Sequence, residues 1–213
     1  MLCSLCRNND LKPFGQNNTR PYFRCQRCHL IEVPPQFHLT AELEKQHYGS
    51  HQNHPDDPGY REFLNRLCEP LAALLPENSK GLDFGCGPGP TLCRLMQERG
   101  HGVNNFDLYF SSDRAALDQR YDFVTMTEVL EHLRAPALEV ARVWQLLEEQ
   151  GYLAVVTQMT DDIENFNEWY YQRDPTHICF WSKSTMRWLA NSLQNAELTF
   201  PGPGLCFLRK RLA

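Results

Sequence analysis

The chain of 213 residues has a formal net charge of −5 and 42 % hydrophobic residues, a composition that suits a globular protein with one sizeable core. Its apolar runs are shorter than the roughly 20 residues of a membrane-spanning helix, and its start lacks a signal-peptide pattern, so we expect a cytoplasmic protein without membrane contact. Residues 1–30 carry five Lys or Arg against one Asp, a charge of +4, which leaves −9 for residues 31–213. The negative charge of residues 31–213 argues against nucleic-acid binding by the whole protein, whereas the positive charge of residues 1–30 is compatible with nucleic-acid binding by that segment.

Two CxxC pairs mark residues 1–35: Cys3 with Cys6, and, after 18 intervening residues, Cys25 with Cys28. Each pair places two thiolates on one side of a tight turn, so together they predict a tetrahedral, structural Zn²⁺ site of the zinc-ribbon type. A segment this short has too little core to fold alone, and we expect the metal to supply most of its stability. A redox dithiol or unrelated cysteines are the competing interpretations.

Residues 36–80 are predicted to form a helical connector or cap. A first helix is expected over residues 40–48, followed by a loop rich in Gly, Pro and Asp. The spacing of His47, His51 and His54 suggests a metal site, but such a loop fixes no ligand geometry and favours solvated side chains. An apolar stripe at helical spacing then predicts a core helix, formed by Phe63, Leu64, Leu67, Leu71, Leu74 and Leu75.

Residues 81–91, GLDFGCGPGPT, predict the end of a buried strand, a glycine turn and the start of a helix, for which Pro90 suits the first position. The GxGxG order matches neither a dinucleotide fingerprint nor a phosphate-binding loop. Asp83, two residues before the first glycine, would repel a pyrophosphate and favour a ligand with positive charge, such as an ammonium and a sulfonium. A glycine turn that merely ends a strand is the alternative.

These residues resemble motif I of the class I S-adenosylmethionine (SAM) dependent methyltransferases, and the resemblance covers about residues 48–213. It implies an α/β fold with a Rossmann-like doubly wound sheet, and a methyltransferase domain over residues 81–213. It also implies that SAM is held by Asp83, Gly85, Cys86 (through its backbone), Gly87 and Gly89, with Tyr48 and Tyr60 as contacts from the preceding cap.

Asp107 follows Gly85 by 22 residues, a spacing at which an acid that ends the second strand accepts hydrogen bonds from ribose hydroxyls. An ordinary loop Asp is the alternative. Only about 13 residues separate Asp107 from the next strand, at 121–126, too few for the usual helix, strand and helix. We therefore predict that the third strand of the fold is missing or vestigial, which removes the loop that normally contacts adenine. The exposed sheet edge would be covered by the ribbon or by a second subunit in a dimer.

Residues 121–133, YDFVTMTEVLEHL, resemble motif IV of the same family. The carboxyl end of this strand is predicted to bring Thr127 and Glu128 to the cofactor. If a helical turn begins at Glu128, its carboxylate shares a face with His132, orients the imidazole and raises its pKa. His132 is then a candidate general base, with a capping or solvated histidine as the alternative.

An aromatic insertion over residues 160–182 follows the next predicted strand and is expected to form the wall and lid of an acceptor pocket. Its DPTHICFWS segment resembles the same methyltransferases and makes His177 a second candidate base, against ordinary loop packing. A helix over 184–195 and hairpin strands over 197–200 and 204–210 are predicted to complete the fold.

The combined prediction is a SAM-dependent methyltransferase (EC 2.1.1.-) that methylates O, N or activated C of a small-molecule acceptor. A different version has the ribbon read RNA or protein through Arg20, Tyr22, Arg24 and Arg27, and so deliver a macromolecular acceptor. A third is a catalytically inactive interaction protein that keeps the zinc ribbon and the SAM fold.

Overall fold

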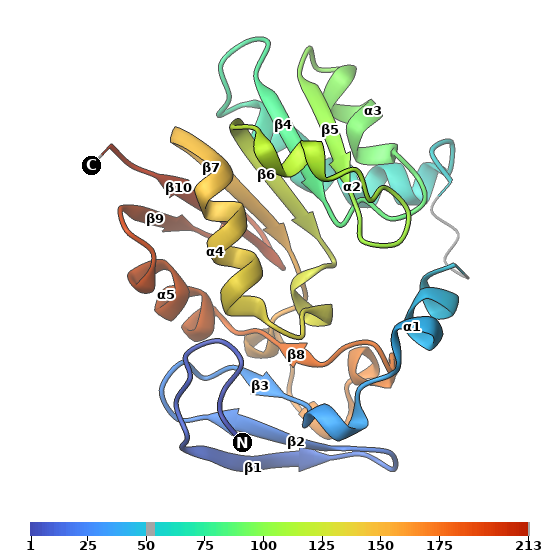
Figure 1. Cartoon of the computed structure of the whole chain (residues 1–213), viewed down its shortest axis with the longest axis vertical. Helices are drawn as coiled ribbons and strands as arrows, with labels where there is room; N and C mark the ends of the chain where they lie inside the picture. Colours follow the sequence, from blue (N-terminus) through green and yellow to red (C-terminus); the bar gives the residue numbers. More distant parts are fainter. Residues whose placement is uncertain (50–53, 213) are drawn as a thin grey trace.

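Two β-sheets organise the computed structural model, which describes residues 1–49 and 54–212 (Figure 1). The larger sheet has six strands in the order β5-β4-β6-β7-β10-β9, and the smaller has four in the order β1-β2-β3-β8. The loop position His51 lies outside the described residues. None of the described helices combines the length and apolar character needed to cross a membrane.

The larger sheet has the doubly wound order that the sequence predicts. Parallel pairing joins its first four strands, and antiparallel pairing adds the terminal hairpin; the strands are β4 (Lys80–Phe84), β5 (Gly102–Phe106), β6 (Tyr121–Thr127), β7 (Leu147–Val156), β9 (Ala196–Thr199) and β10 (Leu205–Lys210). The chain moves outward from β4 to β5 and then returns to β6 on the other side. Such a switch point opens a crevice at the carboxyl ends of the strands.

The predicted loss of the third strand is confirmed. Between β5 and β6 the chain forms only the 3₁₀ helix η2 (Arg114–Asp118) and an isolated bridge between Asp107 and Ser111. This segment is described throughout, and β5 is therefore an edge of the sheet.

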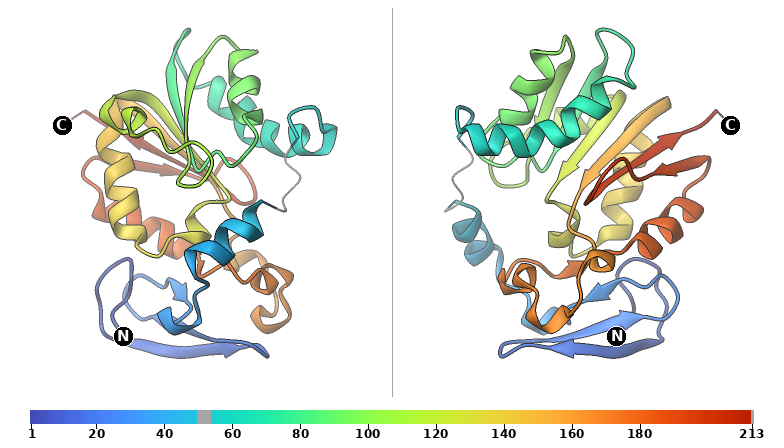
Figure 2. Two further views of the ribbon diagram at one scale, coloured as in Figure 1. Left: turned by 45° about the vertical axis from the view of Figure 1, so that its right-hand side comes forward. Right: turned by 180° about the vertical axis from the view of Figure 1, so that it is seen from behind.

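Helices cover both faces of this sheet (Figure 2). Phe123 on β6 packs in the cluster formed with α2 (Pro58–Ala72) and α3 (Thr91–Gln97). Its neighbour Val124 packs in the cluster with α4 (Pro136–Leu146) and α5 (Lys183–Ser192). This alternation follows from the two-residue period of a strand.

Helix α4 ends at Leu146 and β7 begins with the next residue, so Gly151 does not cap the helix. Gly151 lies inside β7, where a Cβ would lie 2.9 Å from the carbonyl oxygens of Asp122 and Glu148. Close backbone approach therefore requires this glycine, rather than a helix cap.

Residues 1–35, here called the ribbon, share a sheet with the C-terminal half of the chain. Its strands β1 (Leu11–Gln16), β2 (Pro21–Cys25) and β3 (Ile31–Glu32) are extended by β8 (Cys179–Phe180), which pairs with β3. The Tyr22 ring contacts Phe166 and Phe180 edge-on, at centroid distances of 4.9 and 5.5 Å. The aromatic insertion is thus part of the ribbon's core. The helix α1 (Ala41–Tyr48), capped by the Thr40 hydroxyl, follows the ribbon as predicted.

Candidate active site

A cavity of about 740 Å³ opens at the carboxyl ends of β4, β5 and β6 and extends to α1 and the aromatic insertion. Its size is within the range of small-molecule sites. Most of the residues predicted to form the site line this cavity; they are Tyr60, Gly85, Cys86, Gly87, Asp107, Thr127, Glu128, His132 and His177.

The glycine turn shapes one end of the cavity. Gly85 and Gly87 have φ of +82° and +63°, a conformation that side chains rarely adopt. A Cβ on Gly85 would lie 2.4 Å from Val129, whereas a Cβ on Gly87 would meet nothing within 4 Å and face open space. The Gly87 N–H donates to Asp107 at 3.1 Å, so the acid that ends β5 lies directly beside the turn. The turn leaves room for a ligand against its backbone.

Asp83 and Gly89 are not in the cavity wall. Asp83 is 5 % exposed and accepts a hydrogen bond of 2.8 Å from the Thr125 hydroxyl. Burial, opposed by this hydrogen bond and assisted by the charge of Asp107, raises the pKa of Asp83 to about 7. This carboxylate therefore does not face the cavity, and it would act on a ligand only through its charge or through the glycine turn.

Glu128 does not orient His132, contrary to the prediction. Glu128 has a φ of +51°, and helical backbone begins only with the 3₁₀ helix η3 (Leu130–His132). Its carboxylate instead accepts a hydrogen bond from the Tyr171 hydroxyl at 3.0 Å. The left-handed residue turns the side chain away from the following helical face. The neighbouring Thr127 has a buried hydroxyl oxygen without a hydrogen-bond partner among the described residues.

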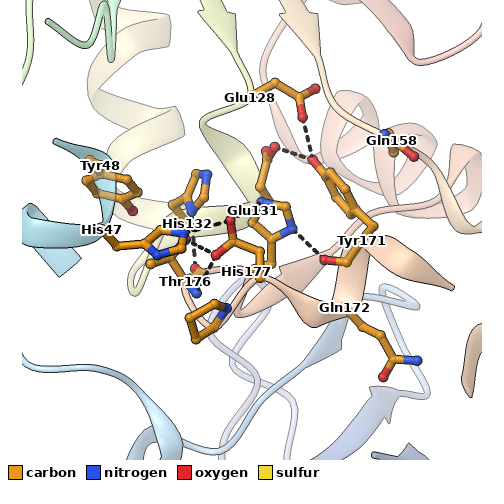
Figure 3. Close-up of polar contacts among 12 residues, drawn as sticks. His47, Tyr48, Glu128, Glu131, His132, Gln158, Tyr171, Gln172, Thr176 and His177 are labelled. Carbon is orange, nitrogen blue, oxygen red and sulfur yellow. Dashed lines mark hydrogen bonds and ion pairs between the residues drawn. The ribbon is translucent and has the colours of Figure 1, made fainter. Parts of the chain in front are cut away.

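A second carboxyl group, that of Glu131, shares the same hydroxyl (Figure 3). Glu131 is fully buried and also accepts from the Thr157 hydroxyl at 3.1 Å. Burial raises the pKa of both Glu128 and Glu131, and the charge of Glu128 raises that of Glu131 further. Tyr171 can donate only one proton, so the arrangement is satisfied when Glu131 is protonated and donates to Tyr171 while Tyr171 donates to Glu128. Sequence reasoning missed Glu131, although it lies three residues after Glu128 in the same motif.

His132 and His177 lie together, with ring centroids 4.7 Å apart. His132 Nδ1 is 3.1 Å from the carbonyl oxygen of Thr176, and His177 Nδ1 is 2.7 Å from that of Tyr171. A carbonyl oxygen only accepts, so both Nδ1 atoms carry the proton and both Nε2 atoms keep a lone pair. Burial lowers the pKa of His132 to about 3, with a further decrease from His177, and burial lowers that of His177 to about 4. Both imidazoles are neutral at pH 7, and the lowered pKa of His132 is opposite to the increase predicted for it.

Three of these groups are arranged as metal ligands could be. Ligand atoms of Glu131, His132 and His177 all lie within 4.8 Å of one another. Neutral imidazoles whose other nitrogen donates to a backbone carbonyl are typical metal ligands. A divalent cation here would require Glu131 to lose its proton, and it would then offset the negative charge of Glu128 and Glu131.

Helix α1 closes the cavity on the side of the ribbon. The Glu44 carboxylate accepts hydrogen bonds from Tyr48, Tyr109 and Arg134 at 3.2, 2.9 and 3.2 Å. The Tyr48 ring packs edge-on against His132 at a centroid distance of 5.2 Å. At the end of the same helix, His47 contacts Asp174 at 3.0 Å. These contacts place α1 over the acceptor side of the cavity.

The four ribbon cysteines are brought together as predicted. The Cys3 and Cys28 sulfurs are 3.5 Å apart, those of Cys6 and Cys25 are 3.4 Å apart, and all four lie within 4.8 Å. The residue after each CxxC pair has a positive φ, of +60° for Arg7 and +63° for His29, so both turns have the same form. Sulfurs bound tetrahedrally at about 2.3 Å from Zn²⁺ would be about 3.8 Å apart, so the cluster fits this ion.

A doubly wound sheet with a glycine turn and an acidic strand end at its switch point defines a nucleotide-binding α/β protein. The sequence family described as Methyltransferase domain matches residues 57–196, more than half of the chain, and the chain belongs to this family. No curated protein matches the chain significantly by sequence.

Solved structures, among them a methyltransferase, have the same fold. The 1,6-didemethyltoxoflavin-N1-methyltransferase of Burkholderia thailandensis, solved with 1,6-didemethyltoxoflavin and S-adenosylhomocysteine, is 16 % identical; the match covers 94 % of this chain and 100 % of that chain, with a TM-score of 0.56. DesVI of Streptomyces venezuelae is 13 % identical, with 81 % and 98 % coverage and a TM-score of 0.52. At these identities the likeness concerns the fold.

Proposed function

We propose that the protein is a SAM-dependent methyltransferase that acts on a small-molecule acceptor. The observation that carries this proposal is the position of Asp107, whose carboxylate lies against the Gly87 amide in the wall of the cavity. An acid at the end of the second strand, beside a glycine turn, suits a ligand with ribose hydroxyls. The toxoflavin methyltransferase relative, solved with S-adenosylhomocysteine, supports the same cofactor.

The residues present fit SAM in three respects. The Gly87 Cα faces open space, the Thr127 hydroxyl lacks a partner among the described residues, and Asp107 can exchange its bond to Gly87 for ribose hydroxyls. When bound, SAM supplies an activated sulfonium methyl group. The chain's contribution is then to align the acceptor in line with that methyl and to limit the access of water, and α1 and the aromatic insertion contribute walls of the cavity for this purpose.

Two roles are open for the imidazoles on the acceptor side. In the first, a neutral Nε2 of His132 or His177 takes the proton of the acceptor, although a pKa of about 3 or 4 limits the strength of this base. In the second, both Nε2 atoms and Glu131 would hold a divalent cation, which would act as a Lewis acid and lower the pKa of an acceptor hydroxyl. The spacing of the three ligand atoms and the neutral imidazoles favour the second role.

The cofactor proposal is tested by calorimetric titration of SAM and of NAD, followed by transfer of a labelled methyl group to a panel of small acceptors. We expect SAM to bind and NAD to give no heat. Asp107→Ala should weaken SAM about 10- to 100-fold, through loss of a charge-assisted contact. Asp113→Ala, an exposed acid of the same segment, should leave it unchanged. Binding of NAD without SAM would overturn the assignment.

The cation proposal is tested with Mg²⁺, Mn²⁺ and Zn²⁺ added separately to protein whose four-cysteine site is already filled. We expect at least one of the ions to bind in wild type and to bind at least about tenfold more weakly in His177→Ala. The exposed His54→Ala should bind as wild type does. If none of the three binds beyond the ribbon site, the cation role is rejected and the base role is retained.

A further inference from the structure

Arg20 links the ribbon to the loop that carries His177. Although it belongs to the turn between β1 and β2, its side chain is buried, with 5 % of the residue exposed. Its guanidinium donates to the carbonyl oxygens of Gln172, Asp174 and Pro175 at 2.9, 2.6 and 2.8 Å. A fourth donor, Nε, contacts the Tyr22 hydroxyl at 3.2 Å. The planar fork of arginine is suited to hold several acceptors in one fixed geometry.

The carbonyl groups that bind Arg20 lie in the chain between the two carbonyl groups that bind the imidazoles. Tyr171 and Thr176, whose carbonyl oxygens accept from His177 and His132, flank the three carbonyls bound by the guanidinium. Displacement of the backbone between them would therefore move both acceptors. Figure 3 shows Tyr171 and Thr176 beside the two imidazoles.

The ribbon also holds the far end of the loop. The Val33 N–H donates to the carbonyl oxygen of Ile178 at 2.9 Å, and the β3–β8 pairing begins directly afterwards. The Ile178 N–H donates in turn to the carbonyl oxygen of Glu131 at 2.8 Å. The loop is thus fixed on both sides of His177 by the ribbon.

Two of the four ribbon side chains expected to contact a macromolecule are not accessible to one, whereas Arg24 is half-buried and Arg27 is exposed. Arg20 and Tyr22, two of the side chains expected to contact RNA, are buried against the insertion. Arg24 and Arg27 lie over the rings of Phe14 and Trp188, at 5.7 and 5.9 Å from the centroids.

We propose that the ribbon is the scaffold of the acceptor half of the active site and that Arg20 is its positioning residue for His132 and His177. The roles of the imidazoles rest on the proposed function, but the positioning itself does not. Loss of the guanidinium would leave three carbonyls without their donors, and the loop would relax away from the imidazoles.

The experiment compares full-length Arg20→Met with wild type, Arg20→Lys and Arg24→Met. Arg24→Met is the matched control, because within the described part of the chain the Arg24 side chain contacts the ribbon itself, at the Phe14 ring and His29 Nδ1. Amide exchange measured by mass spectrometry reports the loop, nitrogen-15 spectra of labelled histidine at one pH report the Nδ1 protons, and calorimetry with SAM reports the cofactor half.

In Arg20→Met we expect exchange across residues 171–178 to accelerate about tenfold or more, with exchange across 81–107 unchanged. The Nδ1–H signals of His132 and His177 should weaken, and SAM affinity should stay within about twofold. Arg20→Lys should behave between Arg20→Met and wild type in both loop exchange and Nδ1–H signals, since lysine keeps the charge but lacks the planar guanidinium. The proposal would be overturned if amide exchange across residues 171–178 and the Nδ1–H signals stayed as in wild type, or if amide exchange accelerated evenly over the chain. Because no outcome depends on methyl transfer, its failure is distinct from failure of the proposed function.

Discussion

The two ends of the cavity are built in different ways. The cofactor end, formed by the glycine turn and Asp107, comes from one continuous stretch of chain, residues 81–107, and is shaped by backbone conformation. The acceptor end joins η3, the loop before β8, α1 and the ribbon, through contacts such as the one between Arg20 and Pro175, 155 residues apart. Local sequence therefore specifies the first end, whereas the second exists only once distant segments have packed.

This difference has an energetic consequence. The cofactor end is supported by the six-stranded sheet and its two helical layers, and the acceptor end depends on a small sheet with a cysteine cluster at its end. A perturbation of either support should affect its own end first. The predictions below test this separation, from the largest expected effect to the smallest.

Loss of the metal that we propose for the four cysteines should have the largest effect. In Cys28→Ser the proposed Zn²⁺ site would lose one of its four ligands, and metal binding that would contribute on the order of 10 kcal/mol to the fold of the ribbon would be weakened or lost. We expect amide protection to be lost over residues 1–33 and 171–180 while SAM still binds. Zinc content and hydrogen exchange measure this. Cys68→Ala, a buried thiol of α2, should keep both zinc and ribbon protection. Equal loss of SAM binding in Cys28→Ser would show that the two ends are not separable.

Replacement of Asp83 should change how stability depends on pH. The folded pKa of about 7 exceeds the ordinary value of 3.8, so the folded state binds this proton more tightly. The free energy of unfolding therefore falls as the pH rises between these two values, by up to about 4 kcal/mol from this group. Asp83→Asn removes the decrease and should be more stable than wild type at pH 8 without ligand. Urea unfolding at pH 4.5 and pH 8 measures the difference, and parallel profiles for the two proteins would contradict it.

Gly85→Ala should weaken the cofactor end alone. The substitution places a methyl group 2.4 Å from Val129 at a φ of +82°, so the turn must shift. We expect a loss of about 2 kcal/mol in SAM binding, roughly 30-fold in affinity, with the zinc content unchanged. Gly102→Ala is the control, because a Cβ there meets nothing within 4 Å and its φ is not positive. Unchanged SAM affinity in Gly85→Ala would place the cofactor elsewhere.

The contrast also explains which features the sequence could predict. The glycine turn and the missing third strand follow from local spacing and from counting residues, whereas the doubly wound sheet follows from the family resemblance. The sheet and the missing strand are confirmed, and Asp107 lies beside the turn. Even the two CxxC turns could be predicted, because each is local. Their position against the aromatic insertion was not predicted, because β8 has only two residues and no distinctive pattern.

The errors share one physical cause, which is tertiary burial. The left-handed φ of Glu128 separates it from His132, and no propensity of that residue indicates such a conformation. Both imidazoles have a lowered pKa because neighbours distant in sequence bury them. Arg20 resembles a surface cation in the sequence, and only the insertion turns it into a buried donor to three carbonyls.

The smallest expected effect concerns the closure of α1 over the acceptor end. Glu44→Gln keeps the shape of the side chain but removes the charge that Tyr48, Tyr109 and Arg134 contact. The Arg134 contact is half exposed, so solvent screening limits the loss to about 0.5–1 kcal/mol. We expect SAM to dissociate about threefold faster, with an unchanged association rate, because the lid opens more often but the cofactor end is intact. Stopped-flow tryptophan fluorescence measures both rates.

Glu42→Gln on the same helix is the matched control, since Glu42 is exposed and lies outside the cavity wall. If Glu44→Gln instead slows association or weakens SAM as strongly as Gly85→Ala, Glu44 contributes to the cofactor end itself. The cofactor end would then include α1, which precedes the glycine turn by more than 30 residues. That end would no longer be formed by one continuous stretch of chain. A change confined to the dissociation rate keeps α1 with the ribbon side, where its contacts to Arg134 and Asp174 already place it.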